Sequence, residues 1–387
     1  MQLDREDENI LAGEYGETRQ KMMEILVALG KVFGAEELVP ITSAQISGAS
    51  YKTIGEWGLE WLKNLDARVA VLSVLNPVGM PRYNWRDIGI SKEFADKQLA
   101  VMDAYRKLGV KMECTCTPYY LYTNLTMQDH LAWSESSAVS YANSVIGAKT
   151  NREGGPSALA AAIIGKTPKY GLHLFKNRMP QVTVEIEDSD ALHAGHFGAI
   201  GYLAGKEVGN RIPYFTNIRA SRDQLKALGA AMAATGAVAL YHVKGITPEA
   251  RLPTFAPEPS EKIVIEASEI ESLFKEKEID AVAVGCPHCS AEELVKISEL
   301  LAGRKVKKPL YIFSSKGVKD ANAGIVSKIQ KTGAKVIEDT CIVVSPAMDK
   351  FDTIMVDSGK AFAYVPNMCG AEARLGSLEE CIEEAVR

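Results

Sequence analysis

The stretch AVAVGCPHCSAEELVKISELL, residues 281–301, decides the class of fold. Residues 281–285 form a short apolar, β-branched run that predicts a buried strand, and residues 290–301 predict an amphipathic helix. The alternation continues downstream, with a strand at 309–314, a helix at 318–332 and strands at 335–338 and 353–356. Such alternation is typical of a doubly wound α/β domain with a parallel sheet.

The pattern upstream is less regular. Apolar runs predict strands at 69–75 and 110–114, separated by an amphipathic helix at 91–108. A helix through residue 147 is expected to begin at Ser134, which is a favourable N-cap residue. Period-two alternation predicts neighbouring strands at 170–175 and 181–187.

The length of 387 residues exceeds what one hydrophobic core normally supports. Three prolines within residues 252–261 predict a linker. We therefore expect three parts. They are an N-terminal α/β region at 1–165 carrying residues 48–50, Asn76, Cys116 and Glu135, a middle region at 166–260, and a C-terminal α/β domain at 261–387 carrying Cys286, Cys341 and Lys360.

Composition and charge exclude several classes of protein. The net charge is −5, and no run of lysine and arginine suits a phosphate backbone, which argues against a nucleic-acid partner. No apolar run approaches the ~18 residues that a membrane span needs. The acidic N-terminus MQLDREDENI has no apolar segment like that of a secretory signal. We expect a cytoplasmic protein without a membrane partner.

Seven cysteines are an odd number, and in a reducing compartment they argue against a disulfide framework. Cys116, Cys286 and Cys341 each follow a predicted strand, and ligands of open parallel sheets bind beyond the carboxyl ends of the strands. Three thiolates there could hold one iron–sulfur cluster and leave an iron open to substrate. The remaining cysteines are interpreted as core residues, apart from Cys289.

Cys286 and Cys289 also form a CxxC motif at a strand-to-helix junction. This layout is found in thiol–disulfide oxidoreductases, so such an enzyme stays an alternative. A scaffold subunit that keeps the fold and lacks chemistry is the other alternative from a different class of function.

Several polar residues are candidates for binding an anionic substrate. The turn at 48–50 can present backbone N–H groups, Lys360 offers a compact charge, and Arg152 can bind a carboxylate through two hydrogen bonds. Glu135 could orient a substrate hydroxyl or transfer its proton, provided that burial raises its pKa. Each also has a structural interpretation. The turn can be a helix-start loop, Lys360 a solvated lysine, Arg152 a partner of Glu153 or a nearby acid, and Glu135 a carboxylate at a helix N-terminus.

A series of ordered motifs covers nearly the whole chain. They are ISGASY at 46–51, NPVG at 76–79, CTPY at 116–119, WSESSA at 133–138, NSVIG at 143–147, TNREG at 150–154, CPH at 286–288, DTC at 339–341 and DSGK at 357–360. Together they resemble the motifs of the aconitase X family. The resemblance implies an aconitase-like multi-domain architecture of mainly parallel, doubly wound sheets flanked by helices. It also implies a hydro-lyase with an iron–sulfur cluster, expected to be [4Fe-4S] and isolable as [3Fe-4S].

Carried over residue by residue, the resemblance assigns the cluster ligands as Cys116, Cys286 and Cys341, with Cys289 as the alternative to Cys341. It assigns catalytic roles to Glu135 and Ser136. Together with Arg152 from its local chemistry, the predicted substrate-binding residues are Gly48, Ala49, Ser50, Asn76, Pro77, Glu135, Ser136, Arg152 and Lys360.

Within the family, the chain resembles the large subunits that dehydrate (R)-5-phosphomevalonate to trans-anhydromevalonate 5-phosphate on a modified mevalonate route to isoprenoids. Other members dehydrate cis-3-hydroxy-L-proline, which is the alternative substrate. In the aconitase superfamily a serine on a swivelling domain serves as the base. The resemblance therefore implies a heterodimer in which a small subunit carries that domain.

Overall fold

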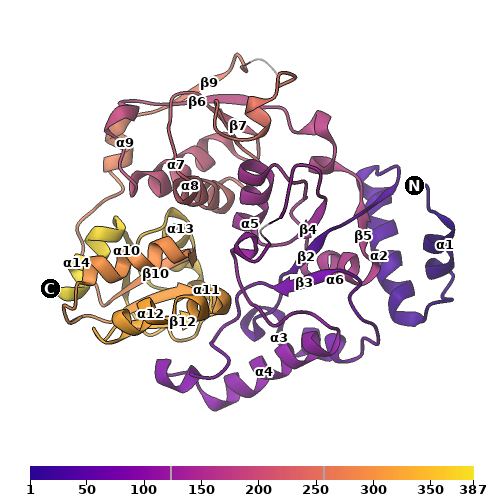
Figure 1. Ribbon diagram of the computed structural model, residues 1–387, viewed down its shortest axis with the longest axis horizontal. Helices are drawn as coiled ribbons and strands as arrows, with labels where there is room; N and C mark the ends of the chain where they lie inside the picture. Colours follow the sequence, from indigo (N-terminus) through magenta and orange to yellow (C-terminus); the bar gives the residue numbers. More distant parts are fainter. Residues whose placement is uncertain (123, 256–257) are drawn as a thin grey trace.

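The computed structural model describes residues 1–122, 124–255 and 258–387. The chain forms three regions, each built around its own parallel sheet (Figure 1). In this view the N-terminal region lies at the right and below, the middle region at the top, and the C-terminal region at the left. Within the predicted linker 252–261, residues 256 and 257 lie outside the described residues.

The sheet of the N-terminal region has the order β3-β2-β4, with all strands parallel. Its core is the nearly all-apolar helix α6, sequence GPSALAAAII, packed against α2. The elements of this region are α1 (Arg5–Leu11), α2 (Glu17–Phe33), β1 (Leu38–Pro40), β2 (Ser43–Ile46), α3 (Tyr51–Lys63), β3 (Leu72–Leu75), α4 (Lys92–Lys107), β4 (Leu131–Trp133), α5 (Ser136–Tyr141), α6 (Gly155–Ile164) and β5 (Lys166–Pro168).

The predicted strand at 110–114 is wrong. Glu113 donates its backbone N–H to the carbonyl of Lys111, and this tight turn interrupts the extended chain. Only Cys114 pairs with Leu75, as an isolated bridge. The segment still follows the edge of β3, so Cys116 arrives beyond the carboxyl end of the sheet, as expected.

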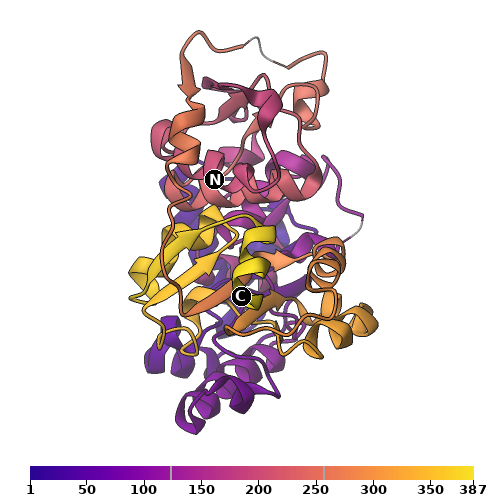
Figure 2. The same ribbon diagram turned by 90° about the vertical axis from the view of Figure 1, so that its left-hand side faces the viewer.

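The middle region contains a parallel sheet of order β8-β7-β6-β9. Helices α7 and α8 pack tightly against each other below it and contact α13 of the C-terminal region (Figures 1 and 2). The predicted strand at 170–175 is wrong, because Gly171 adopts a φ of +54° and starts two short 3₁₀ turns. The elements are β6 (Val182–Ile186), α7 (His196–Val208), β7 (Pro213–Phe215), α8 (Arg222–Thr235), β8 (His242–Val243), β9 (Lys262–Ile265) and α9 (Ala267–Glu271).

The C-terminal region is the doubly wound domain that the sequence predicts, with a parallel sheet of order β12-β11-β10-β13-β14. The predicted helix at 318–332 is divided at Asn322, whose side-chain amide donates to the carbonyl of Val318. The elements are β10 (Ala281–Cys289), α10 (Ala291–Leu301), β11 (Leu310–Ser314), α11 (Lys316–Ala321), α12 (Ala323–Gln330), β12 (Lys335–Glu338), β13 (Thr353–Val356), α13 (Gly359–Met368), β14 (Glu372–Leu375) and α14 (Leu378–Val386).

The two faces of this sheet have different neighbours. One face packs under α10, α12 and α14 in an apolar cluster of its own. The other face packs against α13 and against residues of the N-terminal region, including Trp85 and Ile88. The carboxyl ends of the two sheets thereby meet across this contact. Among the described residues, no helix is long and apolar enough to cross a membrane.

Candidate active site

A cavity of about 410 Å³ lies where the carboxyl ends of the N-terminal and C-terminal sheets meet. Loops after β2, β3 and β4 line one side, while β10 and the segments after β12 and β13 line the other. The structure brings together all the predicted substrate-site residues: Gly48, Ala49, Ser50, Asn76, Pro77, Glu135, Ser136, Arg152 and Lys360. Cys286 and Cys341 line the same cavity.

A buried ion pair joins the two regions inside the cavity. Ser358 caps α13, which places Lys360 in the first turn, where the ammonium donates to the Glu135 carboxylate and to Ser137 Oγ at 3.1 Å. Burial opposes the charge on Lys360, but the Glu135 carboxylate and the nearby thiols outweigh burial and raise its pKa. Both partners are therefore charged.

The same pair sets the state of Glu135. Burial would raise the pKa of Glu135, but Lys360 and then Arg152 outweigh it and lower the pKa below its ordinary value. A proton donor at this position would need a pKa raised by burial, and the pKa of Glu135 is lowered instead. Glu135 is instead a carboxylate that accepts hydrogen bonds.

Glu135 is held on several sides. Its second oxygen accepts from Asn76 Nδ2 at 2.9 Å, and its first accepts from the hydroxyls of Ser136 and Ser137, each at 3.3 Å. Its backbone N–H donates to Oε1 of the fully buried Gln45. Sequence reasoning missed Gln45, although a lone amide inside the buried strand SAQI was a signal.

Ser134 is not the N-cap. Its backbone N–H donates to the carbonyl of Gln45, so it continues the pairing of β4 with β2. Glu135 takes the N-cap position, and α5 begins at Ser136. The carboxylate therefore lies at the point where the strand turns into the helix.

Several polar groups in the cavity lack partners within the described residues. Ser50 Oγ and Asn76 Oδ1 are both buried and unpaired. Gly48, with a φ of +79°, turns the loop that carries Ser50. Arg152 is exposed at the cavity. The neighbouring carboxylate of Glu153 does not pair with it and accepts from Ser157 and Thr167 instead. These groups can bind an oxygen-rich anion.

Lys360 acts electrostatically on all three predicted ligand cysteines, of which Cys286 and Cys341 line the cavity while Cys116 is buried outside its lining. Burial raises the pKa of the Cys116, Cys286 and Cys341 thiols, and Lys360 is the largest influence in the opposite direction on each. Cys286 lies within β10 rather than after it. The strand is bulged there, because Gly285 has a φ of +94° and no room for a side chain beside Phe313.

Cys289 lies on the other face of the same strand. It is buried in the cluster under α10 with Val284 and Leu294, whereas Cys286 belongs to the cluster facing the N-terminal region. The CxxC thiols are thus packed into different cores, which does not support a thiol–disulfide site. The placement also favours Cys341 over Cys289 as a cavity residue.

His288, which sequence reasoning did not single out, connects the cysteine segments. Its Nε2 lies 2.9 Å from the carbonyl of Thr340, so this nitrogen carries the hydrogen. Its Nδ1 then accepts from Thr115 Oγ1 at 3.1 Å. Burial lowers the pKa of His288 to about 4, which keeps the ring neutral.

The donor set fits an iron–sulfur cluster better than a single ion. Within the described ranges, no three His, Cys, Asp or Glu side chains converge closely enough to hold one metal ion. A cluster takes its thiolate ligands on different irons, so its cysteines stand further apart than those of a mononuclear site. Two thiols that line the cavity and a third bonded to the neighbouring His288 backbone suit this requirement, and Lys360 favours the ionised form of all three.

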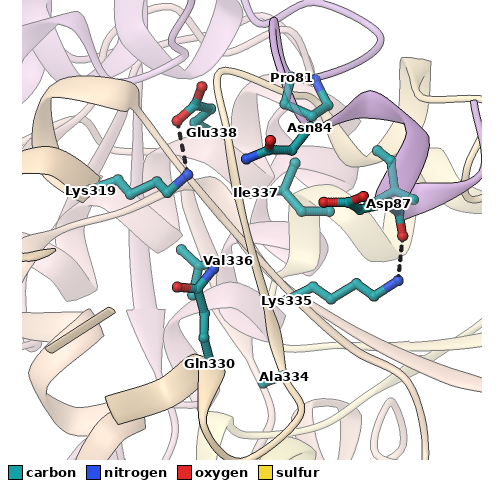
Figure 3. A pocket seen from close by; sticks show the side chains of 11 residues that line it. Pro81, Asn84, Asp87, Lys319, Gln330, Ala334, Lys335, Val336, Ile337 and Glu338 are labelled. Carbon is teal, nitrogen blue, oxygen red and sulfur yellow. Dashed lines mark hydrogen bonds and ion pairs between the residues drawn. The ribbon is translucent and has the colours of Figure 1, made fainter. Parts of the chain in front are cut away.

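A second cavity, of about 210 Å³, lies between the same two regions, where the 3₁₀ turn Trp85–Ile88 meets β12 (Figure 3). Lys335 donates to the backbone carbonyl of Asp87 at 2.6 Å, and Lys319 pairs with Glu338 at 2.8 Å. Both lysines are thus engaged by the protein itself. We interpret this cavity as part of the joint between the regions.

The comparisons with known proteins agree with this site. Profiles of the aconitase X first, second and third domains match residues 1–176, 180–275 and 279–387. The phosphomevalonate dehydratase large subunit of Methanosarcina mazei is 55% identical, over 100% of this chain and 97% of that protein. The chain belongs to the aconitase X family.

Two further relatives place the chain within aconitase X. A crystal structure of the Thermococcus kodakaraensis aconitase X in its holo-form superposes with a TM-score of 0.91 at 45% identity, covering 100% of both chains. The cis-3-hydroxy-L-proline dehydratase of Pseudomonas aeruginosa is 32% identical, over 99% of this chain and 70% of that protein. The aconitase-like architecture expected from the sequence is confirmed.

Proposed function

We propose that this chain is the large subunit of a phosphomevalonate dehydratase, a hydro-lyase of a modified mevalonate pathway to isoprenoids. Its reaction would remove water from (R)-5-phosphomevalonate to give trans-anhydromevalonate 5-phosphate. The observation that carries the proposal is the cavity lined by Lys360, Glu135, Cys286 and Cys341, with the buried thiol of Cys116 close by, bonded to the backbone N–H of His288. The name and 55% identity of the Methanosarcina mazei relative support this substrate.

In this proposal Cys116, Cys286 and Cys341 hold an iron–sulfur cluster, [4Fe-4S] or, as isolated, [3Fe-4S]. When bound, such a cluster supplies a Lewis acid that makes the substrate hydroxyl a better leaving group. Glu135, together with Ser136, would accept the hydrogen of a substrate hydroxyl and hold it in place. Its lowered pKa suits this role as an acceptor.

The anionic ends of the substrate would bind to the cationic and hydroxyl groups. Phosphomevalonate carries a carboxylate and a phosphate, and the cavity offers Lys360 and Arg152 as matching charges. Ser50 Oγ and the backbone of residues 48–50 would donate to the same oxygens. The amide of Asn76, already bonded to Glu135, has a free carbonyl oxygen for a substrate hydroxyl.

A small subunit with a swivelling domain is the proposed partner. The Methanosarcina relative is named a large subunit, which supports a smaller partner. Glu135 is engaged by Lys360, Asn76 and two serines, so we assign the base that removes the substrate proton to the partner. The division at residues 165 and 260 and the cytoplasmic location stay predictions.

The test is turnover by anaerobically reconstituted protein, measured with and without the matching small subunit. We expect conversion of (R)-5-phosphomevalonate only when both subunits are present. NMR of the product measures this conversion. Full activity of the single chain would contradict the assigned base. Turnover of cis-3-hydroxy-L-proline in place of phosphomevalonate would overturn the substrate, and a colourless chain that takes up no iron would overturn the cluster.

A further inference from the structure

His288 contacts the segments of all three candidate cluster ligands. It lies two residues after Cys286 on the bulged part of β10 and is 1% exposed. Its backbone N–H donates to Cys116 Sγ at 3.1 Å. Its ring bonds to Thr115, next to Cys116, and to the carbonyl of Thr340, next to Cys341.

The bonds of His288 continue into a longer buried network. Thr115 Oγ1 also accepts the backbone N–H of Thr117 at 3.0 Å, and the carbonyl of Thr115 accepts from Gln45 Nε2 at 2.7 Å. Gln45 in turn accepts the backbone N–H of Glu135. These hydrogen bonds therefore link the cysteine segments to the backbone of Glu135, whose side chain lines the substrate cavity.

The two ring contacts of His288 fit a neutral imidazole. Thr340 offers a carbonyl, which only accepts, so one ring nitrogen must donate. The other nitrogen lies 3.1 Å from the Thr115 hydroxyl, which can donate to it. Both ring nitrogens are occupied, so His288 is not itself free to coordinate iron.

We propose that His288 is a positioning residue, which fixes the three cysteine segments at the spacing that one iron–sulfur cluster requires. This inference rests on the proposed function, in which Cys116, Cys286 and Cys341 are the ligands. The backbone N–H of His288 also contributes a hydrogen bond to a ligand sulfur, and such bonds tune cluster stability. Cluster retention, more than folding, then depends on this side chain.

The test compares wild type with His288→Ala and His288→Gln in the full chain. Iron and acid-labile sulfide are measured after anaerobic reconstitution, together with the rate at which a chelator removes iron. Removing outer-shell partners typically costs about 10–100-fold in metal affinity. We expect iron loss to be at least about tenfold faster for His288→Ala. His288→Gln keeps a donor for Thr340 and should retain an intermediate amount of cluster.

His242 provides the matched control. It is also 1% exposed and bonds through Nε2 to a backbone carbonyl, that of Arg178, at 2.7 Å, but it lies in the middle region. His242→Ala should alter thermal unfolding while keeping wild-type iron and sulfide. If His288→Ala does not fold, His288→Gln and Thr115→Val carry the test, because each removes one side of the ring contacts.

The outcomes separate this inference from the proposed function. A wild-type chain that assembles no cluster overturns the cluster proposal, and the inference with it. A wild-type cluster retained equally well by His288→Ala, His288→Gln and Thr115→Val overturns only the role of His288. Equal iron loss in His242→Ala would show that any buried defect releases the cluster, and this result also overturns the specific role.

Discussion

Two buried ion pairs in this molecule look alike and are built for different purposes. Arg178 pairs with Glu249 at 2.6 Å in the joint between the N-terminal and middle regions, and Lys360 pairs with Glu135 in the cavity. Arg178 is fully buried, and its guanidinium also donates to Asn143 Oδ1 and to three backbone carbonyls, those of Asn143, Ala148 and Leu172. Every donor group of Arg178 is thus used by the protein.

Lys360 is less completely engaged. Of its three N–H donors, the described residues use two, through Glu135 and Ser137, and the ammonium lines a cavity. Unpaired oxygens of Ser50 and Asn76 line the same space. Burial alone therefore does not identify a functional charge. A buried charge with unused hydrogen-bonding capacity beside a cavity indicates binding, whereas a fully satisfied one indicates structure.

The largest expected effect is on activity and follows from Lys360. We expect Lys360→Met, assayed with the small subunit, to lower kcat/KM by about 10²–10³-fold, the order of loss seen when one preorganised donor is removed. The cavity lets Glu135 take up a proton or water, so the unfolding free energy should fall by less than for Arg178. An equal loss of stability in the Lys360 and Arg178 variants would contradict the view that the two ion pairs have different roles.

Arg178→Met should have the largest effect on stability. It leaves Glu249 buried without its partner, and breaking such a pair typically costs about 3–5 kcal/mol. Urea unfolding of the isolated chain measures this difference. Arg178→Lys is the matched variant, because it keeps the charge and loses most of the planar hydrogen bonds. A wild-type unfolding midpoint for Arg178→Met would contradict the structural role.

Periodic and glycine-marked segments could be predicted from the sequence. The C-terminal strands and helices appear nearly where expected, because each is a buried run followed by a capped helix. The strand at 110–114 was wrong because a tight turn at Lys111 and Glu113 depends on the neighbouring β3. Residue type and periodicity carry no record of such tertiary hydrogen bonds.

The candidate site shows the same division. Its residues could be proposed from motifs, but the state of Glu135 could not, since its pKa depends on Lys360, which is distant in sequence. Gln45 and His288 were assigned no role from the sequence, although Gln45 is a lone amide between apolar residues and His288 lies in the CPH motif. Their importance arises only from partners that folding brings together, namely Thr115, Glu135 and Thr340.

The comparison also predicts a pH dependence around Arg178. Burial lowers the pKa of His242, which bonds to the carbonyl of Arg178, to about 4, from an ordinary value near 6.5. Between about pH 6.5 and pH 4 the unfolded state binds a proton that the folded state does not, so stability falls as the pH falls. At 1.36 kcal/mol per pKa unit, the free energy of unfolding decreases by up to about 3 kcal/mol over this window because of His242.

Unfolding free energies measured across this window should therefore decrease more steeply for wild type than for His242→Gln. Glu135 gives a signal of the same sign in a lower pH window. Its pKa is lowered from an ordinary value of 4.5, so the stabilising effect of its pair with Lys360 is complete above that value and is lost progressively as the pH falls from it through the lowered value. Equal slopes for wild type and His242→Gln would show that His242 is not held neutral.

The smallest expected effect is the sharpest test of the rule about unused hydrogen bonds, because two serines differ only in location. Ser50 Oγ and Ser140 Oγ are both buried without partners in the described parts of the chain, but only Ser50 lines the cavity. Neither alanine variant loses a protein hydrogen bond, so both unfolding free energies should stay within about 0.5 kcal/mol of wild type.

A hydrogen bond to a charged ligand group contributes about 1.5–3 kcal/mol, so Ser50→Ala should weaken substrate binding at least about tenfold. Titration calorimetry with (R)-5-phosphomevalonate measures this, and Ser140→Ala should bind like wild type. If both variants bind equally well, an unpaired buried oxygen at the cavity is a packing feature, and the distinction between the Lys360 and Arg178 environments loses its functional meaning.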